Sequence, residues 1–179
     1  MRSTLFSSIV FIGIALSISS CNKDKDDDGD IIYPSLTATV TVSGAVSQSY
    51  AFTNSQNDGV SNTHSMISNY ISSTGLLSVM GSSADYVFSM GAPFPAVQTG
   101  TYALTNAEYG HLDGQQSTSF DELVSGSLAI TSVQLLQAVG VTSTYSVSGS
   151  WVTEISDGQN PPSTVTITGS FTNLVLVAS

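Results

Sequence analysis

The side chains able to do acid–base or metal chemistry are few, and His111 is the first to consider. His111 and Asp113 stand close together in a polar segment, with Glu108, Asp121 and Glu122 near them in the sequence. Imidazole and carboxylate groups are common ligands of zinc and of other divalent metals. A single His-x-Asp pair is frequent by chance, and a solvated loop accounts for it equally well. We therefore expect neither a metal site nor a cofactor.

The other candidates lack catalytic motifs as well. Neither His64 nor His111 lies near a Gly-x-Ser-x-Gly elbow, which would present a serine nucleophile. Asp121 and Glu122 are adjacent, so in a strand they would face opposite sides and could not flank one glycosidic bond. No Lys or Arg follows Lys25 to orient an anionic substrate. No residue is therefore predicted to be catalytic.

Cys21 is the only cysteine, and its surroundings indicate a specific modification. It follows a charged start at Arg2 and an apolar run from Leu5 to Leu16. That run is shorter than the roughly 20 residues of a membrane-spanning helix, and the order is typical of a secretory signal. Ile18 precedes Cys21 with small residues between them, a spacing that resembles the bacterial lipobox.

This resemblance implies that residues 1–20 are a lipoprotein signal peptide and that Cys21 becomes the N-terminus of the mature chain. The sulfur would carry a diacylglyceryl thioether and the amine an acyl chain. Stable anchoring needs two or more chains, because each buried CH₂ contributes only about 0.8 kcal/mol. The alternative is a plain secretory signal cleaved after Ser20. With Cys21 lipidated, no thiol remains for a disulfide, so the fold must rest on its core.

Residues 21–34 are predicted to be the lipidated cysteine and an acidic tether. A Lys followed by an acidic run directly after the cysteine resembles the surface-export signal of Bacteroidota lipoproteins, which implies an outer-membrane protein facing the medium. The simpler alternative is a solvated spacer of at most about 45 Å. A third interpretation is a calcium loop, in which Ser35 would replace the required bidentate Glu. The residues that match that loop are Asp24, Asp26, Asp28 and Gly29.

The charge distribution excludes several classes of partner. The net charge is −10, and the basic residues are Arg2, Lys23 and Lys25, so the expected domain, residues 35–179, carries acidic side chains alone. Binding of nucleic acid depends on Lys and Arg against the phosphates, so it is excluded. An anionic headgroup surface is an equally poor partner for the domain.

The domain is predicted to be an antiparallel β-sandwich of about eight to ten strands, with a closed up-and-down barrel as the alternative. Leu36, Ala38, Val40 and Val42 alternate with hydroxyl residues, which is typical of a half-buried strand. A polar loop is expected around His111 and Gly114. No window of eleven or more residues shows a helical stripe, although Ser132 to Ala138 could form one helical turn. Further strands are expected at Val46 to Phe52, Met66 to Ile71, Leu76 to Met80, Tyr86 to Met90, Thr101 to Leu104 and Leu123 to Thr131.

The clearest element is a C-terminal hairpin around a turn at Ser156 to Pro162. Folding it symmetrically about Gln159 predicts three cross-strand pairs, with Ser and Thr on the outer face, Ser146 among them. The glycines leave room for the neighbouring Trp and Phe side chains. The expected pairs are Trp151 with Ile167, Gly149 with Gly169, and Val147 with Phe171.

A short apolar–hydroxyl–Gly–Ser–apolar unit recurs at Val124 to Leu128, Val147 to Trp151 and Ile167 to Phe171. Together with a Gly-Thr-Tyr-x-Leu element at Gly100 to Leu104, this order resembles the small Bacteroidota lipoprotein domains of unknown function. The likeness covers roughly residues 98–177. It implies an all-β domain on a lipid anchor, and it carries no activity or functional residues to transfer.

Ligand binding by the domain would need exposed aromatic side chains, a cavity or a regular polar face. Phe94, between Pro93 and Pro95, is the best candidate for a presented aromatic, although packing over the sheet is the simpler expectation. The aromatics expected in the core by strand parity are Tyr86, Phe88, Tyr102, Tyr109 and Phe120. The threonine ladders (Thr37, Thr39, Thr41; Thr164, Thr166, Thr168) resemble an ice-binding face, but the strand propensity of Thr explains them.

The sequence thus predicts a lipid-anchored β-domain at the outer membrane and cell surface, acting as a non-enzymatic binding or interaction module. A hydrolase of surface polysaccharide is the alternative. The expected partners are the membrane, through Cys21, and a glycan or protein whose identity the residues leave open, as they do the oligomeric state.

Overall fold

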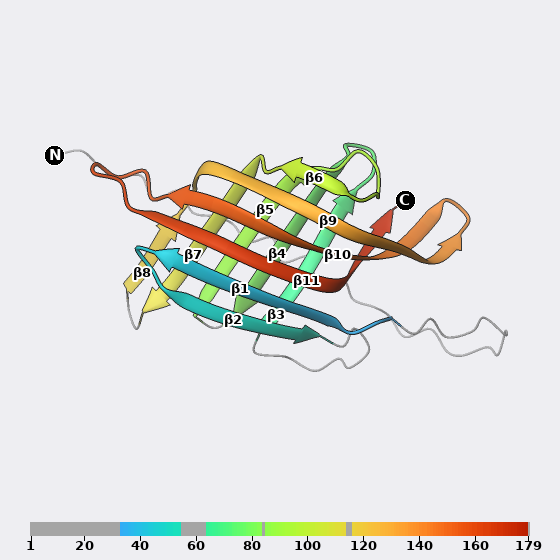
Figure 1. Cartoon of the computed structure of the whole chain (residues 1–179), viewed down its shortest axis with the longest axis horizontal. Helices are drawn as coiled ribbons and strands as arrows, with labels where there is room; N and C mark the ends of the chain where they lie inside the picture. Colours follow the sequence, from blue (N-terminus) through green and yellow to red (C-terminus); the bar gives the residue numbers. More distant parts are fainter. Residues whose placement is uncertain (1–32, 55–63, 84, 114–115, 179) are drawn as a thin grey trace. The chain divides into compact units, whose positions relative to one another are not determined.

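Two antiparallel β-sheets lie face to face, with their strands crossing steeply (Figure 1). The computed structural model describes residues 33–54, 64–83, 85–113 and 116–178. Within these residues eleven strands form two sheets, and neither sheet closes on itself. The expected sandwich is therefore confirmed over the barrel, with one strand more than the upper end of the expected range.

The six-stranded sheet has the order β2-β1-β11-β10-β9-β6. It is built from long C-terminal strands flanked by shorter ones. In that order its strands are β2 (Gln48–Asn54), β1 (Leu36–Gly44), β11 (Thr164–Ala178), β10 (Thr142–Ser156), β9 (Glu122–Val139) and β6 (Gly100–Ala103).

The five-stranded sheet has the order β3-β4-β5-β7-β8 and contains only sequential neighbours apart from β6, which joins the other sheet. Short turns favour this antiparallel pairing of consecutive strands. Its strands are β3 (His64–Ile71), β4 (Leu76–Ser83), β5 (Tyr86–Pro93), β7 (Asn106–Asp113) and β8 (Gln116–Phe120).

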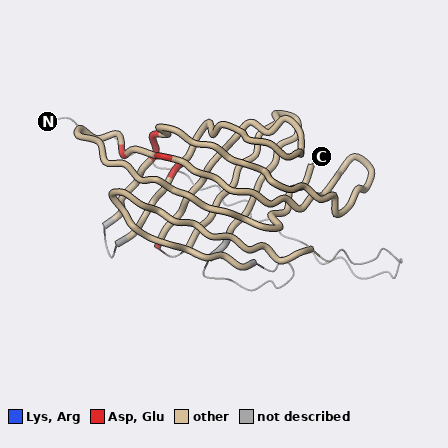
Figure 2. Tube along the Cα trace, viewed as in Figure 1, with Lys and Arg blue, Asp and Glu red and all other residues tan. Residues whose placement is uncertain are grey.

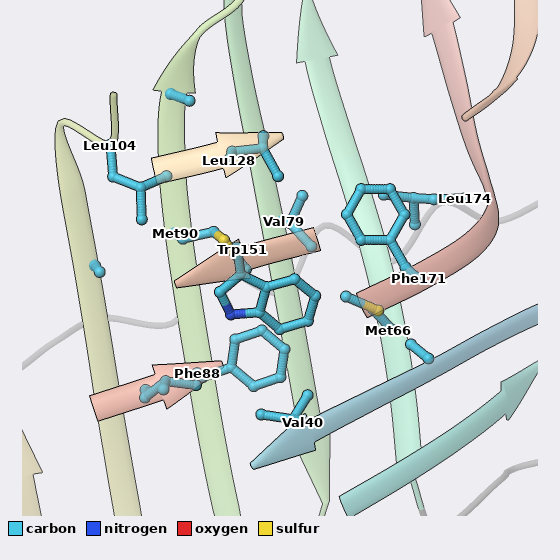
Figure 3. Packing of buried hydrophobic residues seen from close by; sticks show 14 of the residues in the cluster. Val40, Met66, Val79, Phe88, Met90, Leu104, Leu128, Trp151, Phe171 and Leu174 are labelled. Atoms are coloured by element: carbon cyan, nitrogen blue, oxygen red, sulfur yellow. The ribbon is translucent and has the colours of Figure 1, made fainter. Parts of the chain in front are cut away.

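The core lies between the sheets, and Trp151 is at its centre (Figure 3). The Trp151 ring stacks on Phe88 at 5.7 Å between ring centroids and lies 6.0 Å from Phe171. Gly169 faces the indole, and a Cβ built there would lie 2.3 Å from Trp151 Cζ2. The expectation that the strand glycines make room for large aromatics is therefore confirmed.

Alternation along β1 follows the predicted pattern, with Leu36, Ala38, Val40 and Val42 buried and the threonines between them exposed. Because side chains of a strand point alternately to its two faces, this places one hydroxyl-bearing face of the sheet outward. The same holds for β2, where Phe52 is buried and its neighbours Ala51 and Thr53 are exposed.

Two predicted elements are wrong. The segment expected as a polar loop around His111 forms β7 and the start of β8, paired from Tyr109 with Phe120 to Asp113 with Gln116. The helical turn expected at Ser132 to Ala138 is part of β9, which runs without a break in the strand to Val139. Pairing with β10 along its whole length overrides the local preference of Leu and Gln for helix.

The hairpin register is also wrong, by two residues near the turn. Trp151 pairs with Gly169 and Gly149 with Phe171, and a bulge between Val147 and Gly149 then pairs Val147 with Leu174. The centre of the hairpin is therefore Asn160, one residue beyond the expected Gln159. In the connecting turn Asp157 N donates to Ser163 O at 3.1 Å, and a cis peptide bond precedes Pro161. Beyond the bulge Ser146 is 4% exposed, so it does not belong to the outer face.

Candidate binding face

The outward side of the six-stranded sheet carries hydroxyl side chains in cross-strand rows, and we call it the hydroxyl face. Directly opposite residues of neighbouring strands share a face, so the pairing registers define each row. The longest row crosses the whole sheet, from Ala51 through Thr39, Ser170, Ser150 and Ala129 to Thr101. The next runs from Ser49 through Thr41, Thr168, Val152 and Ser127 to Ala103.

Shorter rows flank these two. One contains Thr53, Thr37 and Thr172, and the other contains Ser43, Thr166, Glu154 and Ser125. Most of these side chains are exposed, and the others are half-buried. Thr39 Oγ1 and Ser170 Oγ form a hydrogen bond of 3.1 Å across the β1–β11 pair. Each Ser and Thr hydroxyl of the face can both donate and accept, so the rows can match either role of a ligand group.

Two shallow hollows open on the hydroxyl face. One, of about 230 Å³, lies over β2, β1 and β11 and is lined by residues that include Thr37, Thr39 and Ser170. The other, of about 380 Å³, lies over β9, β10 and β11 between Ser127, Glu154 and Thr166. Both are wide open to solvent, so they fit parts of an extended ligand better than an enclosed small molecule.

The rows of the hydroxyl face contain one charged side chain, Glu154. The acidic positions of the described chain gather in the half of the molecule around the β10–β11 turn (Figure 2). Asp121 N donates to Ser156 O at 3.1 Å, and Glu122 pairs with Ser156. Most of the face is thus neutral, and the described residues include no Lys or Arg.

The residues considered for a metal do not converge. Glu108 is exposed on the outward side of β7, whereas His111 lies on the inward side with Tyr109. The His111 ring is parallel to that of Tyr109 with 6.4 Å between centroids, and its buried Nδ1 has no hydrogen-bond partner among the residues that the structure describes. In the described part of the chain no three His, Cys, Asp or Glu side chains are grouped to hold a metal ion.

Asp121 and Glu122 are exposed at the start of β9, and Asp113 belongs to β7. Glu122 extends toward the β10–β11 turn, where a Cβ on Gly158 would lie 2.9 Å from Glu122 Oε1. Asp121 precedes the first residue of β9, so the two carboxylates do not belong to one strand.

Three tyrosines meet between the sheets at the end where β2 begins. Tyr50 stacks on Tyr86 with 3.5 Å between centroids, and its hydroxyl lies 3.0 Å from that of Tyr109. Burial raises the pKa of Tyr86 and of Tyr109 well above the usual value, and the bond to Tyr50 raises the pKa of Tyr109 further. Burial raises the pKa of Tyr50 as well, and its bond to Tyr109 partly offsets this. The cluster is therefore a neutral contact that ties the two sheets together.

The other aromatics belong to the core. Phe94 is 0% exposed, so packing over the sheet, and not presentation to a ligand, is confirmed. Its ring meets Tyr70 and Tyr102 edge-on, with 5.6 Å and 4.8 Å between centroids. The burial in the core that strand parity predicted is likewise confirmed for Tyr86, Phe88, Tyr109 and Phe120, whereas Tyr102 is only partly buried.

Several predicted features lie outside the described residues. They are the signal peptide, Cys21, the acidic run with Asp24, Asp26, Asp28 and Gly29, and the side chain of His64. Among the residues that are described, no helix has the length and apolar character needed to cross a membrane.

The sequence indicated the ladders of β1 and β11 but not the extent of the face. Its rows become continuous only because β9 and β6 join the same sheet, which the registers show. Comparisons with protein-family models, with curated proteins and with solved structures each find no match. The fold and the face define the class of protein: an all-β domain of two stacked antiparallel sheets with one neutral hydroxyl-bearing face.

Proposed function

We propose that the protein is a lipid-anchored domain of the outer membrane and cell surface that acts as a non-enzymatic binding module. Its binding surface is the hydroxyl face, and its ligand is a neutral polymer rich in hydroxyl groups, such as a glycan. This follows the resemblance to small Bacteroidota surface lipoproteins, with Cys21 as the site of lipidation.

The observation that carries this proposal is that every strand of the six-stranded sheet contributes at least one hydroxyl to these rows, which alanine and Val152 interrupt, and that Glu154 is their one charged member. Single hydrogen bonds contribute little net free energy, typically about 1 kcal/mol, because water competes for each group. An extended face adds many such contacts along a polymer, which a small ligand could not use.

The charge of the chain selects the ligand class. A net charge of −10, with every basic residue at or before Lys25, repels anionic polymers from the domain. A neutral glycan is not repelled, and its hydroxyls can both donate hydrogen bonds to Ser and Thr and accept hydrogen bonds from them.

A glycan array with the purified chain tests the ligand. Thr41 and Thr168 form a cross-strand pair on the face, and replacing both by Val removes two hydroxyls while keeping shape and strand propensity. We expect the wild type to bind neutral glycans and T41V/T168V to lose most of the signal. The matched control, S117A/S119A, removes two exposed hydroxyls from β8 in the other sheet and should bind normally.

Equal binding by both double variants would refute the hydroxyl face as the binding surface. The alternative function, hydrolysis of surface polysaccharide, is tested on chromogenic glycosides and esters. Turnover that is lost in Glu154→Gln, the carboxylate beside the larger hollow, would favour the hydrolase.

Cys21→Ala tests the anchor. We expect the wild type to incorporate labelled palmitate and to fractionate with membranes, and the variant to do neither. Replacing Asp24, Asp26, Asp27 and Asp28 by Ala should leave lipidation intact and lower the fraction accessible at the cell surface. Unchanged surface staining would leave the acidic run as a spacer only.

A further inference from the structure

The hairpin between β9 and β10 ends in an apolar tip that projects from the sandwich, at the right of Figure 1. Val139 pairs with Thr142, so Gly140 and Val141 form a two-residue turn. Gly140 has a φ of +59°, which suits the first central position of a type II′ turn. We call residues 135–144 the β9–β10 tip.

The exposed side chains of the tip are apolar, where turn residues are usually polar. Val141, at the apex, is 90% exposed, Val139 62% and Leu135 54%. Turns favour Gly, Asn, Asp and Pro, so a β-branched apolar residue at the apex has no local conformational reason. Exposed large apolar side chains that are grouped in this way often mark a surface that becomes buried against a protein or a membrane.

The tip is also uncharged. No Asp, Glu, Lys or Arg occurs from Leu123 to Thr153. The acidic turn at Asp157 lies at the other end of β10, whose 15 residues span roughly 50 Å at about 3.3 Å per residue. The acidic turn of the domain is therefore far from the tip. Val139 pairs with Thr142, and Ala138 pairs with Ser143. This pairing gives backbone N–H and C=O groups hydrogen-bond partners that lipid could not provide.

The start of the domain lies at the same end as the tip. Ser35 O accepts a hydrogen bond of 3.2 Å from Asn173 Nδ2, and Ser146 Oγ donates to Asn173 Oδ1 at 3.3 Å. Asn173 thus joins the beginning of β1 to the part of β10 that leads into the tip. The chain that precedes Ser35 therefore starts from the end of the sandwich that carries the apolar residues.

We propose that the β9–β10 tip inserts into the phospholipid bilayer that holds the N-terminal anchor. This inference rests on the proposed lipidation of Cys21. Residues 22–34 reach at most about 45 Å, so an anchored domain stays near the bilayer, and the end that carries the tip is the end to which the tether is attached. Insertion of Val139, Val141 and Leu135 to the level of the headgroups and first methylenes adds a second contact. Two contacts fix the orientation of the domain, and the acidic turn then points away from the membrane.

The lack of other cysteines permits a direct test. In the lipidated full chain the Cys21 sulfur is blocked, so Val141→Cys supplies a single thiol for an environment-sensitive dye. The protein is reconstituted in phosphatidylcholine vesicles with and without lipids brominated in the acyl chains. We expect a blue shift of the dye at position 141 and quenching of at least about twofold by the brominated lipids.

Gln159→Cys is the matched control, since it is an exposed turn position at the other end of β10. Its dye should show neither effect. If the mass of the chain shows that it carries the lipid but the dye at position 141 is not quenched, tip insertion is refuted and the lipid anchor is not. A chain without lipid mass would refute the anchor itself, and quenching is then measured with the Cys21→Ser form.

A second measurement uses the unlipidated Cys21→Ser chain and vesicle flotation. Adding Val139→Asp and Val141→Asp should lower vesicle partitioning at least about tenfold, since two buried apolar groups become charged. Both positions lie outside the core, so the near-UV spectrum should not change. Equal partitioning overturns the proposal. A blue shift at position 141 that grows with protein concentration in the absence of vesicles would also overturn it, because it would indicate pairing of two copies.

Discussion

The strand glycines show how single residues determine the packing of this sandwich. Gly169 lies under Trp151, and an added Cβ would also be 2.7 Å from Thr39 O, a backbone atom that cannot rotate away. Gly169→Ala should therefore lower the free energy of unfolding by roughly 1–3 kcal/mol, the usual cost of overpacking. Urea unfolding followed by Trp fluorescence measures this change.

Gly110→Ala is the matched control for that experiment. Gly110 is also in a strand, but it is on the outward side of β7, where a Cβ would meet only Val87 Cγ1 at 3.3 Å. The change should stay within about 0.5 kcal/mol, as for most surface substitutions. Equal destabilisation by the two variants would mean that the contact with Trp151 does not govern the effect, since strand propensity alone favours Ala over Gly.

The tyrosine cluster predicts a loss of stability at alkaline pH. Burial raises the pKa of Tyr50, Tyr86 and Tyr109 in the folded state, above the value of about 10 in the unfolded chain. Below pH 10 both states keep these protons, so the three groups cause no pH dependence. Above it the unfolded state ionises first, so the free energy of unfolding falls as the pH rises. Tyr86 and Tyr109, whose pKa values are raised furthest, each contribute up to about 1.4 kcal/mol per pH unit.

Denaturant melts between pH 8 and 11.5 test this dependence. Tyr86→Phe removes one of the three titrating groups, so its stability should fall less steeply above pH 10 than that of the wild type. An unchanged slope would show that other groups cause the alkaline transition.

The turn between β10 and β11 is a hydrogen-bonded element organised by one carboxylate. Asp157 Oδ1 accepts from Ser163 N at 2.9 Å and from Gln159 N at 3.0 Å. These backbone donors, Ser163 first, hold the pKa of Asp157 below its usual value. Asp157→Ala should therefore lower the melting temperature at pH 7.

The difference in melting temperature should shrink as the pH falls. A lowered pKa stabilises the fold above the unfolded value near 3.8, and this is lost as the carboxylate is protonated in the folded state. Melting both proteins at pH 7 and at pH 2.5 checks the sign. A difference that persists in acid would mean that the side chain acts through packing.

Elements whose pattern is local were predictable from the sequence, and those that depend on a partner strand were not. The alternation of Leu36 to Val42 specifies an inner and an outer face by itself. In β7, Gly110 and the polar neighbours of His111 weaken the same alternation, and pairing with β5 and β8 decides the structure. The hairpin register depends on which residue is at the centre of the turn, and a shift of two residues leaves the apolar faces unchanged, so the apolar pattern does not contain it.

At the scale of the whole molecule, the class of fold could be predicted but the candidate surface could not. The hydroxyl face requires the order of six strands, in which β1 is paired with the distant β11. Likewise, Val139 and Val141 look like core residues of a strand, and only their exposure shows that nothing in the described chain covers them. Sequence patterns report periodicity, whereas a surface depends on which strands become neighbours.

The charge distribution of the whole chain gives a prediction for proteolysis on intact cells. Trypsin cuts after Lys or Arg, and the last such residue is Lys25. Even the unfolded domain should therefore survive trypsin, and cells that display it should release a product of residues 26–179. Chymotrypsin instead reports folding, because Phe52 and Trp151 are 1% and 4% exposed within strands.

Core strands open only at close to the free energy of global unfolding, so the domain should resist chymotrypsin in buffer, apart from a cut near Tyr33, and be degraded in urea. Mass spectrometry of the released products distinguishes the outcomes. Absence of the 26–179 product from intact cells, with its appearance after lysis, would place the domain on the periplasmic side. Rapid chymotryptic loss without urea would contradict a packed sandwich, since Trp151 can reach the protease only when both sheets have separated.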